Sequence, residues 1–256
     1  MDRKQFQKRL DYKVLSIRAG LWGKAFRALD YVGVTRTTVL AKRNKFRVEL
    51  NGTGTIWIIT SVIKTKKTPF SYTRTRSVFD EDERLLQTAE TIASIKKNSE
   101  KSIIIVMEGS NSPRINELRA RDVWIYQKRS LVLKLLINGP FKGLGEAIQI
   151  LIVQPVLDAD SYIRKISGRY LVKTKLENRP IFFREQAGSA ISITYGMTGP
   201  VFLDWQNFLG NNLRSLSRGI SMEQLLCRFA KENSFEASPK LGVSGRVAVT
   251  GGEINV

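Results

Sequence analysis

The sequence contains no histidine and a single cysteine, Cys227. The absence of histidine excludes histidine acid/base catalysis, histidine metal ligands and any Ser-His-Asp triad. One cysteine cannot form an internal disulfide framework, which is typical of a reducing compartment. No apolar run approaches the ~20 residues of a transmembrane helix, and the first ten residues lack the apolar segment of a signal peptide. We therefore expect a cytoplasmic protein; if it is an enzyme, its base is a carboxylate or a substrate group.

Acidic residues are few relative to basic ones. The 256 residues include 42 Lys and Arg but 23 Asp and Glu, which gives a net charge of +19. Such an excess favours anionic partners, namely nucleic acid, an anionic membrane surface or a phosphorylated ligand. The charge alone does not choose among these partners.

The basic residues are densest in residues 1–50, which hold 13 Lys and Arg against 4 acids. The apolar residues between them fall roughly on one helical face; they are Leu10, Val14, Ile17, Leu21 and Phe26. A helix of this kind can lie on an anionic membrane surface, or it can pack its apolar stripe on the rest of the protein. Because residues 51–54 (NGTG) form a clear break, we predict a basic N-terminal extension over 1–54 and one domain over 55–256.

Short β-branched runs alternate with helical patterns from Ile56 onward. Strands are predicted at 56–61, 103–107, 123–126, 163–172, 181–184 and 191–195. Helices are predicted at 80–98, 139–153, 201–216 and 222–231, with capping boxes at Asp80/Glu83 and Ser221/Gln224; the run 131–137 fits a helix or a strand. This rhythm predicts an α/β fold whose ligand binds beyond the carboxyl ends of the strands.

Polar residues follow the first two predicted strands. Thr60 and Ser61 end the first strand, and Glu108 and Ser110 follow the second. A carboxylate at this place can accept a hydrogen bond from a ribose hydroxyl or a base imide, as acids do in nucleotide-binding α/β sheets. The alternative for Glu108 is an ordinary strand-to-loop turn.

Two further segments suit a phosphate group. Arg74 and Arg76 are two residues apart in the loop after the first strand, and guanidinium groups clamp phosphate oxygens in pairs; the alternative is an exposed loop with scattered arginines. Lys142 and Gly143 stand at the start of a predicted helix, where backbone N–H groups favour anions. The alternative for this segment is a plain helix start, since its spacing is not that of a Walker A loop.

The predicted strand 163–172 carries near its end a group of residues that could supply positive charge to an anionic ligand. Gly168 permits a close backbone approach, Arg169 offers a fixed positive charge, and Tyr170 can stack on a sugar or base; the alternative is a strand with a bulge at the glycine. Asp158 and Asp160 form a DxD that suggests a metal site. These two acids precede the strand rather than follow it, so we favour Arg169 over a metal ion.

In chain order, these segments resemble a family of GT-A-type glycosyltransferases found in bacterial surface-polysaccharide gene clusters and in some large viruses. The matching segments are IWIITSVI, PFSYTRTRSVFDEDERLLQTAETIASI, IIIVMEGS, KGLGEA, IRKISGRYLV, GISMEQLL and LGVSGRVAVTGG. The resemblance implies a GT-A-like nucleotide-binding open sheet. It also places Gly168-Arg169-Tyr170 where ordinary GT-A enzymes have their metal-binding DxD, so we expect no cofactor, with Mg or Mn as the alternative.

The function that the resemblance implies is transfer of a sugar from a nucleotide-diphosphate donor to a surface-polysaccharide or lipid-linked acceptor. The expected donor-binding residues are Thr60, Ser61, Arg74, Arg76, Glu108, Ser110, Lys142, Gly143, Gly168 and Tyr170. Arg169 is expected to stabilise the departing diphosphate, and the candidate bases are Glu146, Asp204 and Glu223. The competing classes are a basic nucleic-acid-binding protein, for which no signature motif is present, and a non-catalytic membrane-associated domain of the same fold.

Overall fold

The computed structural model describes residues 13–14, 17, 20–25, 44–46, 54–66, 69–99, 101–110, 112–127, 131–155, 161–176, 178–186, 189–190 and 194–256. Its centre is a six-stranded sheet with the strand order β4-β3-β2-β6-β11-β8. The parallel strands are β2 (Thr55–Ser61), β3 (Ser102–Glu108), β4 (Val123–Gln127) and β6 (Tyr162–Ser167). β11 (Thr194–Thr198) pairs antiparallel with β6 and with β8 (Ile181–Phe182).

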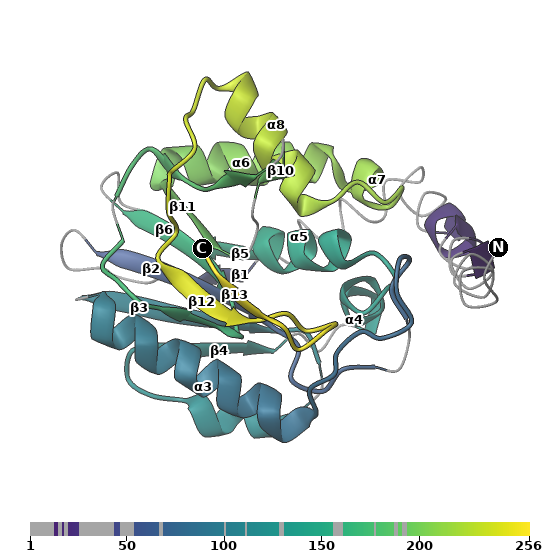
Figure 1. Ribbon diagram of the computed structural model, residues 1–256, viewed down its shortest axis with the longest axis horizontal. Coiled ribbons are helices and arrows are strands. Elements are labelled where there is room, and N and C mark those ends of the chain that lie inside the picture. The colour runs from purple at the N-terminus through teal and green to yellow at the C-terminus, as the bar shows by residue number, and fades with distance from the viewer. Residues whose placement is uncertain are drawn as a thin grey trace.

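Helices cover both faces of this sheet (Figure 1). They are α3 (Glu81–Asn98), the 3₁₀ helix η1 (Pro113–Leu118), α4 (Leu131–Ile137), α5 (Lys142–Ile152), α6 (Gly199–Asn211), α7 (Leu213–Leu216) and α8 (Met222–Glu232). In Figure 1 α3 lies below the sheet, whereas α5, α6 and α8 lie above it. The mixed sheet with helices on both sides confirms the predicted α/β class.

β2 is buried on both faces because successive side chains of a strand point to opposite sides. Ile56 and Ile58 belong to the core that includes α5, α6 and α8. Trp57 and Ile59 belong to the core between the sheet and α3. All four are at most 1% exposed, which is why the strand reads as a continuous apolar run rather than an alternating one.

The two predicted capping boxes are confirmed. The Asp80 side chain accepts from the Glu83 N–H at 2.9 Å, and the Glu83 carboxylate accepts from the Asp80 N–H at 3.1 Å. Ser221 and Gln224 make the same reciprocal pair at the start of α8. These caps satisfy N–H groups that the first turn leaves without helical partners.

The prediction of one strand over 163–172 is wrong. The chain turns at Gly168 and Arg169, and β7 (Tyr170–Val172) joins a different sheet with β12 (Val243–Arg246) and β13 (Glu253–Asn255). The predicted helix 201–216 is also two helices, α6 and α7, with a break at Asn212. The ambiguous run 131–137 is helical.

The basic N-terminal extension contributes two described pieces. β1 (Asn44–Phe46) pairs in parallel with β5 (Val153–Pro155). Trp22, in the helical residues 20–25, packs edge-on against Phe141 with ring centroids 5.9 Å apart. A small antiparallel pair, β9 (Glu185–Gln186) with β10 (Ser189–Ala190), completes the described strands. Within the described residues, no helix combines the length and the apolarity needed to cross a bilayer.

Candidate functional site

A cavity of about 350 Å³ opens beyond the carboxyl ends of two neighbouring parallel strands, β2 and β6. Thr60 and Ser61 line it from the end of β2, and Ser167 lines it from the end of β6. The chain places β3 on one side of β2 and β6 on the other, so the strand order reverses at this point. Ligands of open α/β sheets bind in the crevice at such a switch point.

The turn after β6 brings Arg169 and Tyr170 to the cavity. A Cβ atom at position 168 would come within 2.9 Å of the Thr88 hydroxyl oxygen, so Gly168 permits the turn to lie against α3. Arg169 Nε donates to the carbonyl oxygen of Arg246 at 3.4 Å. The C-terminal strands thus hold the Arg169 side chain beside the end of β6.

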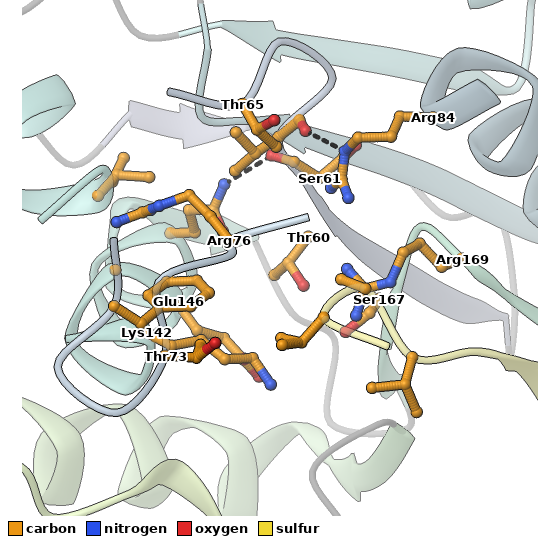
Figure 2. Close-up of a pocket in the computed structure, with 18 of the residues that line it drawn as sticks. Thr60, Ser61, Thr65, Thr73, Arg76, Arg84, Lys142, Glu146, Ser167 and Arg169 are labelled. Carbon is orange, nitrogen blue, oxygen red and sulfur yellow. Dashed lines mark hydrogen bonds between the residues drawn. The ribbon is translucent and has the colours of Figure 1, made fainter. Parts of the chain in front are cut away.

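Four cationic side chains line the cavity: Arg76, Arg84, Lys142 and Arg169. Figure 2 shows Arg84 and Arg169 on one side of Thr60, and Arg76 and Lys142 on the other. Among the described lining residues, Glu146 is the one acid. An excess of positive charge in a partly enclosed cavity attracts an anion, and guanidinium groups favour phosphate and carboxylate oxygens.

Two of these arginines are anchored by the protein itself. Arg76 Nη2 donates to two backbone carbonyl oxygens at the end of α4, and its guanidinium carbon lies 4.2 Å from the centroid of the Phe70 ring. Arg84 Nε donates to the carbonyl oxygen of Val62. Burial lowers the pKa of both guanidinium groups. They supply fixed positive charge, whereas Arg169 and Lys142 stand nearer to solvent.

Glu146 forms a buried ion pair behind the cavity wall. Lys165 Nζ lies 2.5 Å from Glu146 Oε1, and its side chain is fully buried. The same ammonium donates to Ser167 Oγ at 3.2 Å. Burial lowers the pKa of Lys165, and the Glu146 carboxylate opposes this shift. The pair positions the Glu146 carboxyl group at the cavity, while the Lys165 ammonium stays out of contact with solvent.

Sequence reasoning missed Arg84 and Lys165. Lys165 lies in the middle of a buried strand, and a lysine is almost never fully buried unless it is paired. Its position in a predicted core strand, between Ile163 and Ile166, is therefore a signal for a buried acid elsewhere in the chain. The helical pattern of α3 gave no comparable signal for Arg84, because a charged residue in an amphipathic helix is usually on the solvent side.

The structure brings seven of the predicted site residues to the cavity: Thr60, Ser61, Arg76, Lys142, Glu146, Arg169 and Tyr170. Gly168 shapes the adjacent turn. Arg74 is exposed and is not among the lining residues, and Asp204 is exposed on α6. Gly143 and Glu223 line a neighbouring cavity.

Glu108 and Ser110 are enclosed by the protein rather than open to a ligand. Glu108 is 3% exposed, and its carboxylate accepts from the backbone N–H of Ser110 at 2.7 Å and of Ile63 at 3.1 Å. Ser110 Oγ accepts from the Lys64 N–H at 3.1 Å. The two side chains hold the loops that follow β2 and β3. In this geometry the Glu108 carboxylate is enclosed, so it cannot make the predicted contact with a ribose.

A metal site was the alternative to Arg169 at the strand end. In the part of the chain that the structure describes, no group of three or more Cys, Asp or Glu residues could hold a metal ion. Asp158 and Asp160 lie outside the described residues. The structure places Arg169 in the turn that follows β6, and the choice between Arg169 and the acid pair stays a prediction.

Comparisons with known proteins returned no relative from which a function could be transferred. No protein-family model matches the chain, and no curated protein sequence matches it. The chemistry of the site is therefore argued from its own geometry. A cationic cavity with strand-end hydroxyls and one positioned carboxylate can bind a phosphorylated ligand and accept a proton from it or from a second substrate.

Proposed function

We propose that the protein is a glycosyltransferase that moves a sugar from a nucleotide-diphosphate donor to a glycan or lipid-linked acceptor. The observation that carries the proposal is the cavity at the switch point of the sheet, with four cationic side chains around the ends of β2 and β6. Such a position suits a nucleotide, and such a charge suits its diphosphate. The family resemblance of the sequence supports the same assignment.

The residues take the following roles in this proposal. Thr60 and Ser61 hydrogen-bond the nucleoside at the end of β2. Arg169 and Lys142 contact the diphosphate, and their charge stabilises it as it departs. Glu146 is the catalytic base, because it is the acid that reaches the cavity among the described lining residues. Glu223 remains a candidate from the neighbouring cavity.

Nucleotide binding tests the proposal. UDP, GDP, CDP and their glucose or mannose conjugates are screened by thermal shift and then by calorimetry. At 100 times Kd, a ligand that binds only the folded state stabilises it by about 2.7 kcal/mol, which is a clear rise in Tm. We expect one base to be preferred, slow hydrolysis of its sugar conjugate, and weaker binding by Arg169→Ala.

The control variant is Arg246→Ala, which removes an exposed arginine that does not line the cavity. Its nucleotide affinity should equal that of the unmodified protein. If no nucleoside diphosphate or nucleotide sugar binds, or if Arg169→Ala binds as well as Arg246→Ala, the assignment is wrong.

A further inference from the structure

A second cavity, of about 280 Å³, adjoins the first. The two share three lining residues, Tyr72, Lys142 and Glu146. The far wall of the second cavity is the loop before α8 and its first turn, including Ile220 and Glu223. A group bound in the second cavity would therefore face a group bound in the first across the Glu146 carboxylate.

The two cavities differ in the sign of their charge. The first has four cationic residues and one acid. The second has Lys142 as its one cation among the described lining residues, with Glu146 and Glu223 as its acids. The pKa of Lys142 is raised, because the attraction of the Glu146 and Glu223 carboxylates outweighs the partial loss of hydration of its ammonium group. Two carboxylates against one ammonium therefore disfavour the binding of an anion in the second cavity.

The walls of the second cavity also combine apolar and polar groups. Leu216 and Met222 are at most 1% exposed and form an apolar side. Tyr72 is half-exposed and stacks on Phe70 with ring centroids 5.5 Å apart and planes at 9°. A sugar ring has apolar C–H faces and hydroxyl donors at its edge, so it can pack on an aromatic ring while its hydroxyls donate to carboxylates.

A third cavity, of about 480 Å³, lies on the other side of the first. It shares only Arg169 with the first among the lining residues. Its described acids, Glu83, Glu90 and Glu253, do not line the first cavity, so the two cavities share no described carboxylate that could take a proton from an acceptor hydroxyl. The second cavity is therefore the better place for the acceptor.

We propose that the second cavity is the acceptor subsite and that it selects a neutral or amino sugar over an acidic one. This inference rests on the proposed function. In the transfer, the acceptor hydroxyl oxygen forms a bond to the anomeric carbon of the donor sugar, and the bond from that carbon to the diphosphate oxygen breaks. The hydroxyl proton passes to Glu146, and the bonding electron pair leaves with the nucleoside diphosphate.

Two variants test the subsite separately from donor binding. Ile220→Trp puts a large ring at the rim of the second cavity, where Ile220 is 40% exposed. The matched control is Leu203→Trp, which makes a similar change on α6 at a side chain that is 39% exposed and does not line these cavities. Glu223→Gln removes one acid with little change in shape.

The probes are methyl glucoside, methyl glucosaminide and methyl glucuronide, measured by saturation-transfer NMR with and without UDP, GDP or CDP. We expect the first two to bind and the glucuronide to bind at least about tenfold more weakly, because it meets like charge. Ile220→Trp should abolish glycoside binding and leave nucleotide binding unchanged, as Leu203→Trp leaves both. Glu223→Gln should recover glucuronide binding by about tenfold.

The outcomes separate this inference from the proposed function. Nucleotide binding without any glycoside binding overturns the subsite alone, and so does glycoside binding that Ile220→Trp leaves intact. Equal binding of glucoside and glucuronide overturns the selectivity. Glycoside binding that depends on Ile220, in a protein that binds no nucleotide, supports a sugar site but overturns the transferase.

Discussion

Arg169 is positioned by its neighbours in the chain and by strands far away in sequence. Gly168 lets the turn after β6 approach α3, and the carbonyl oxygen of Arg246 accepts from Arg169 Nε. The side chain lines the cavity but is only partly buried. Its removal should therefore leave the core intact and change the charge of the site.

Arg169→Ala should reduce turnover far more than stability. Removal of one hydrogen-bond donor from an oxyanion hole lowers kcat by a factor on the order of 10²–10³. We expect a similar factor when Arg169, which stabilises the departing diphosphate, is removed. Arg169→Lys should rescue poorly, because an ammonium lacks the planar fork for two phosphate oxygens. Steady-state kinetics and thermal unfolding of both variants, with Arg246→Ala as control, provide the measurement. Unchanged kcat would contradict the role of Arg169.

Glu108 is a buried acid with a structural role, and its ionisation affects folding. Burial raises the pKa of the Glu108 carboxyl, although the N–H groups of Ser110 and Ile63 and the charge of Arg84 act against this shift. Because the folded-state pKa lies above the unfolded one, the folded protein holds the proton more tightly. The stability that this carboxyl contributes is therefore present below the unfolded pKa and is lost as pH rises through the folded one.

The difference in unfolding free energy between the unmodified protein and Glu108→Gln should follow that pH dependence. The unmodified protein should be most stable relative to the variant below about pH 4.5, near the unfolded value, and should lose this advantage as pH rises through the folded pKa. Urea unfolding at a series of pH values measures the difference. Glu90→Gln, at an exposed position on α3, is the control and should show no such trend. A difference that grows with pH would contradict the assignment.

At the scale of elements, α5 carries Lys142 and Glu146 to the site, and its position depends on α4. A Cβ atom at Gly145 would lie 2.4 Å from the carbonyl oxygen of Ile137, which ends α4. Because that neighbour is backbone, it cannot move aside as a flexible side chain can. Gly145, which itself lines the cavity, therefore sets the distance between the two helices there.

Gly145→Ala should destabilise the protein by about 1–3 kcal/mol, as overpacking of a filled contact does. Gly210→Ala in α6 is the matched control, since its Cβ would meet only Leu151 at 4.0 Å. That change should stabilise the protein by up to about 1 kcal/mol, because alanine is the better helix former. Chemical denaturation of both variants measures the contrast. Equal effects of the two substitutions would show that the α4–α5 contact is not as close as described.

The N-terminal helical residues are a second element with a prediction of their own. Val14, Ile17 and Leu21 are 44%, 58% and 62% exposed, within an extension of net positive charge. Trp22 packs on Phe141, next to the start of α5. In Figure 1 this helical segment lies beyond α4 and α7, away from the sheet. The exposed side chains of Val14, Ile17 and Leu21 are thus available to contact a membrane surface.

We predict that this extension attaches the protein to anionic membranes. Each Lys or Arg near an anionic leaflet contributes roughly 1 kcal/mol, and the contribution falls with salt. Co-sedimentation with phosphatidylserine vesicles should weaken sharply at high salt, and it should weaken when Val14, Ile17 and Leu21 are all replaced by serine. Phosphatidylcholine vesicles are the control surface. Equal sedimentation of the triple variant would contradict the prediction.

At the scale of the whole molecule, the sequence predicted what local patterns determine. The apolar run of β2 and the capping boxes of α3 and α8 depend on residues within a few positions of one another. The position of Thr60 and Ser61 at the ligand-binding edge of the sheet was also predicted locally, because the end of a buried strand can be recognised in the sequence. The α/β class follows from the alternation of such elements.

Contacts between distant residues could not be predicted in this way. β7 leaves the line of β6 because it pairs with β12, some 70 residues later, and no local pattern records that partner. The ion pair of Lys165 with Glu146 joins a strand to a helix across the core. Glu108 was expected to contact the ligand, but the backbone N–H groups of Ile63 and Ser110 donate hydrogen bonds to its carboxylate.

The charge of the whole cavity leads to the last prediction, on metal dependence. Four cationic side chains surround the ends of β2 and β6, with Arg169 at the strand end where an acid pair would hold an ion. If these residues neutralise the departing diphosphate, EDTA should leave activity nearly unchanged and Asp160→Ala should be tolerated, whereas Arg169→Ala should not. The rival account assigns a Mg or Mn ion to Asp158 and Asp160, and it predicts the reverse for all three measurements. Assays of the unmodified protein and both variants, with and without EDTA, distinguish the accounts. EDTA removes a divalent ion that stabilises the diphosphate charge, but it does not affect an arginine that does so.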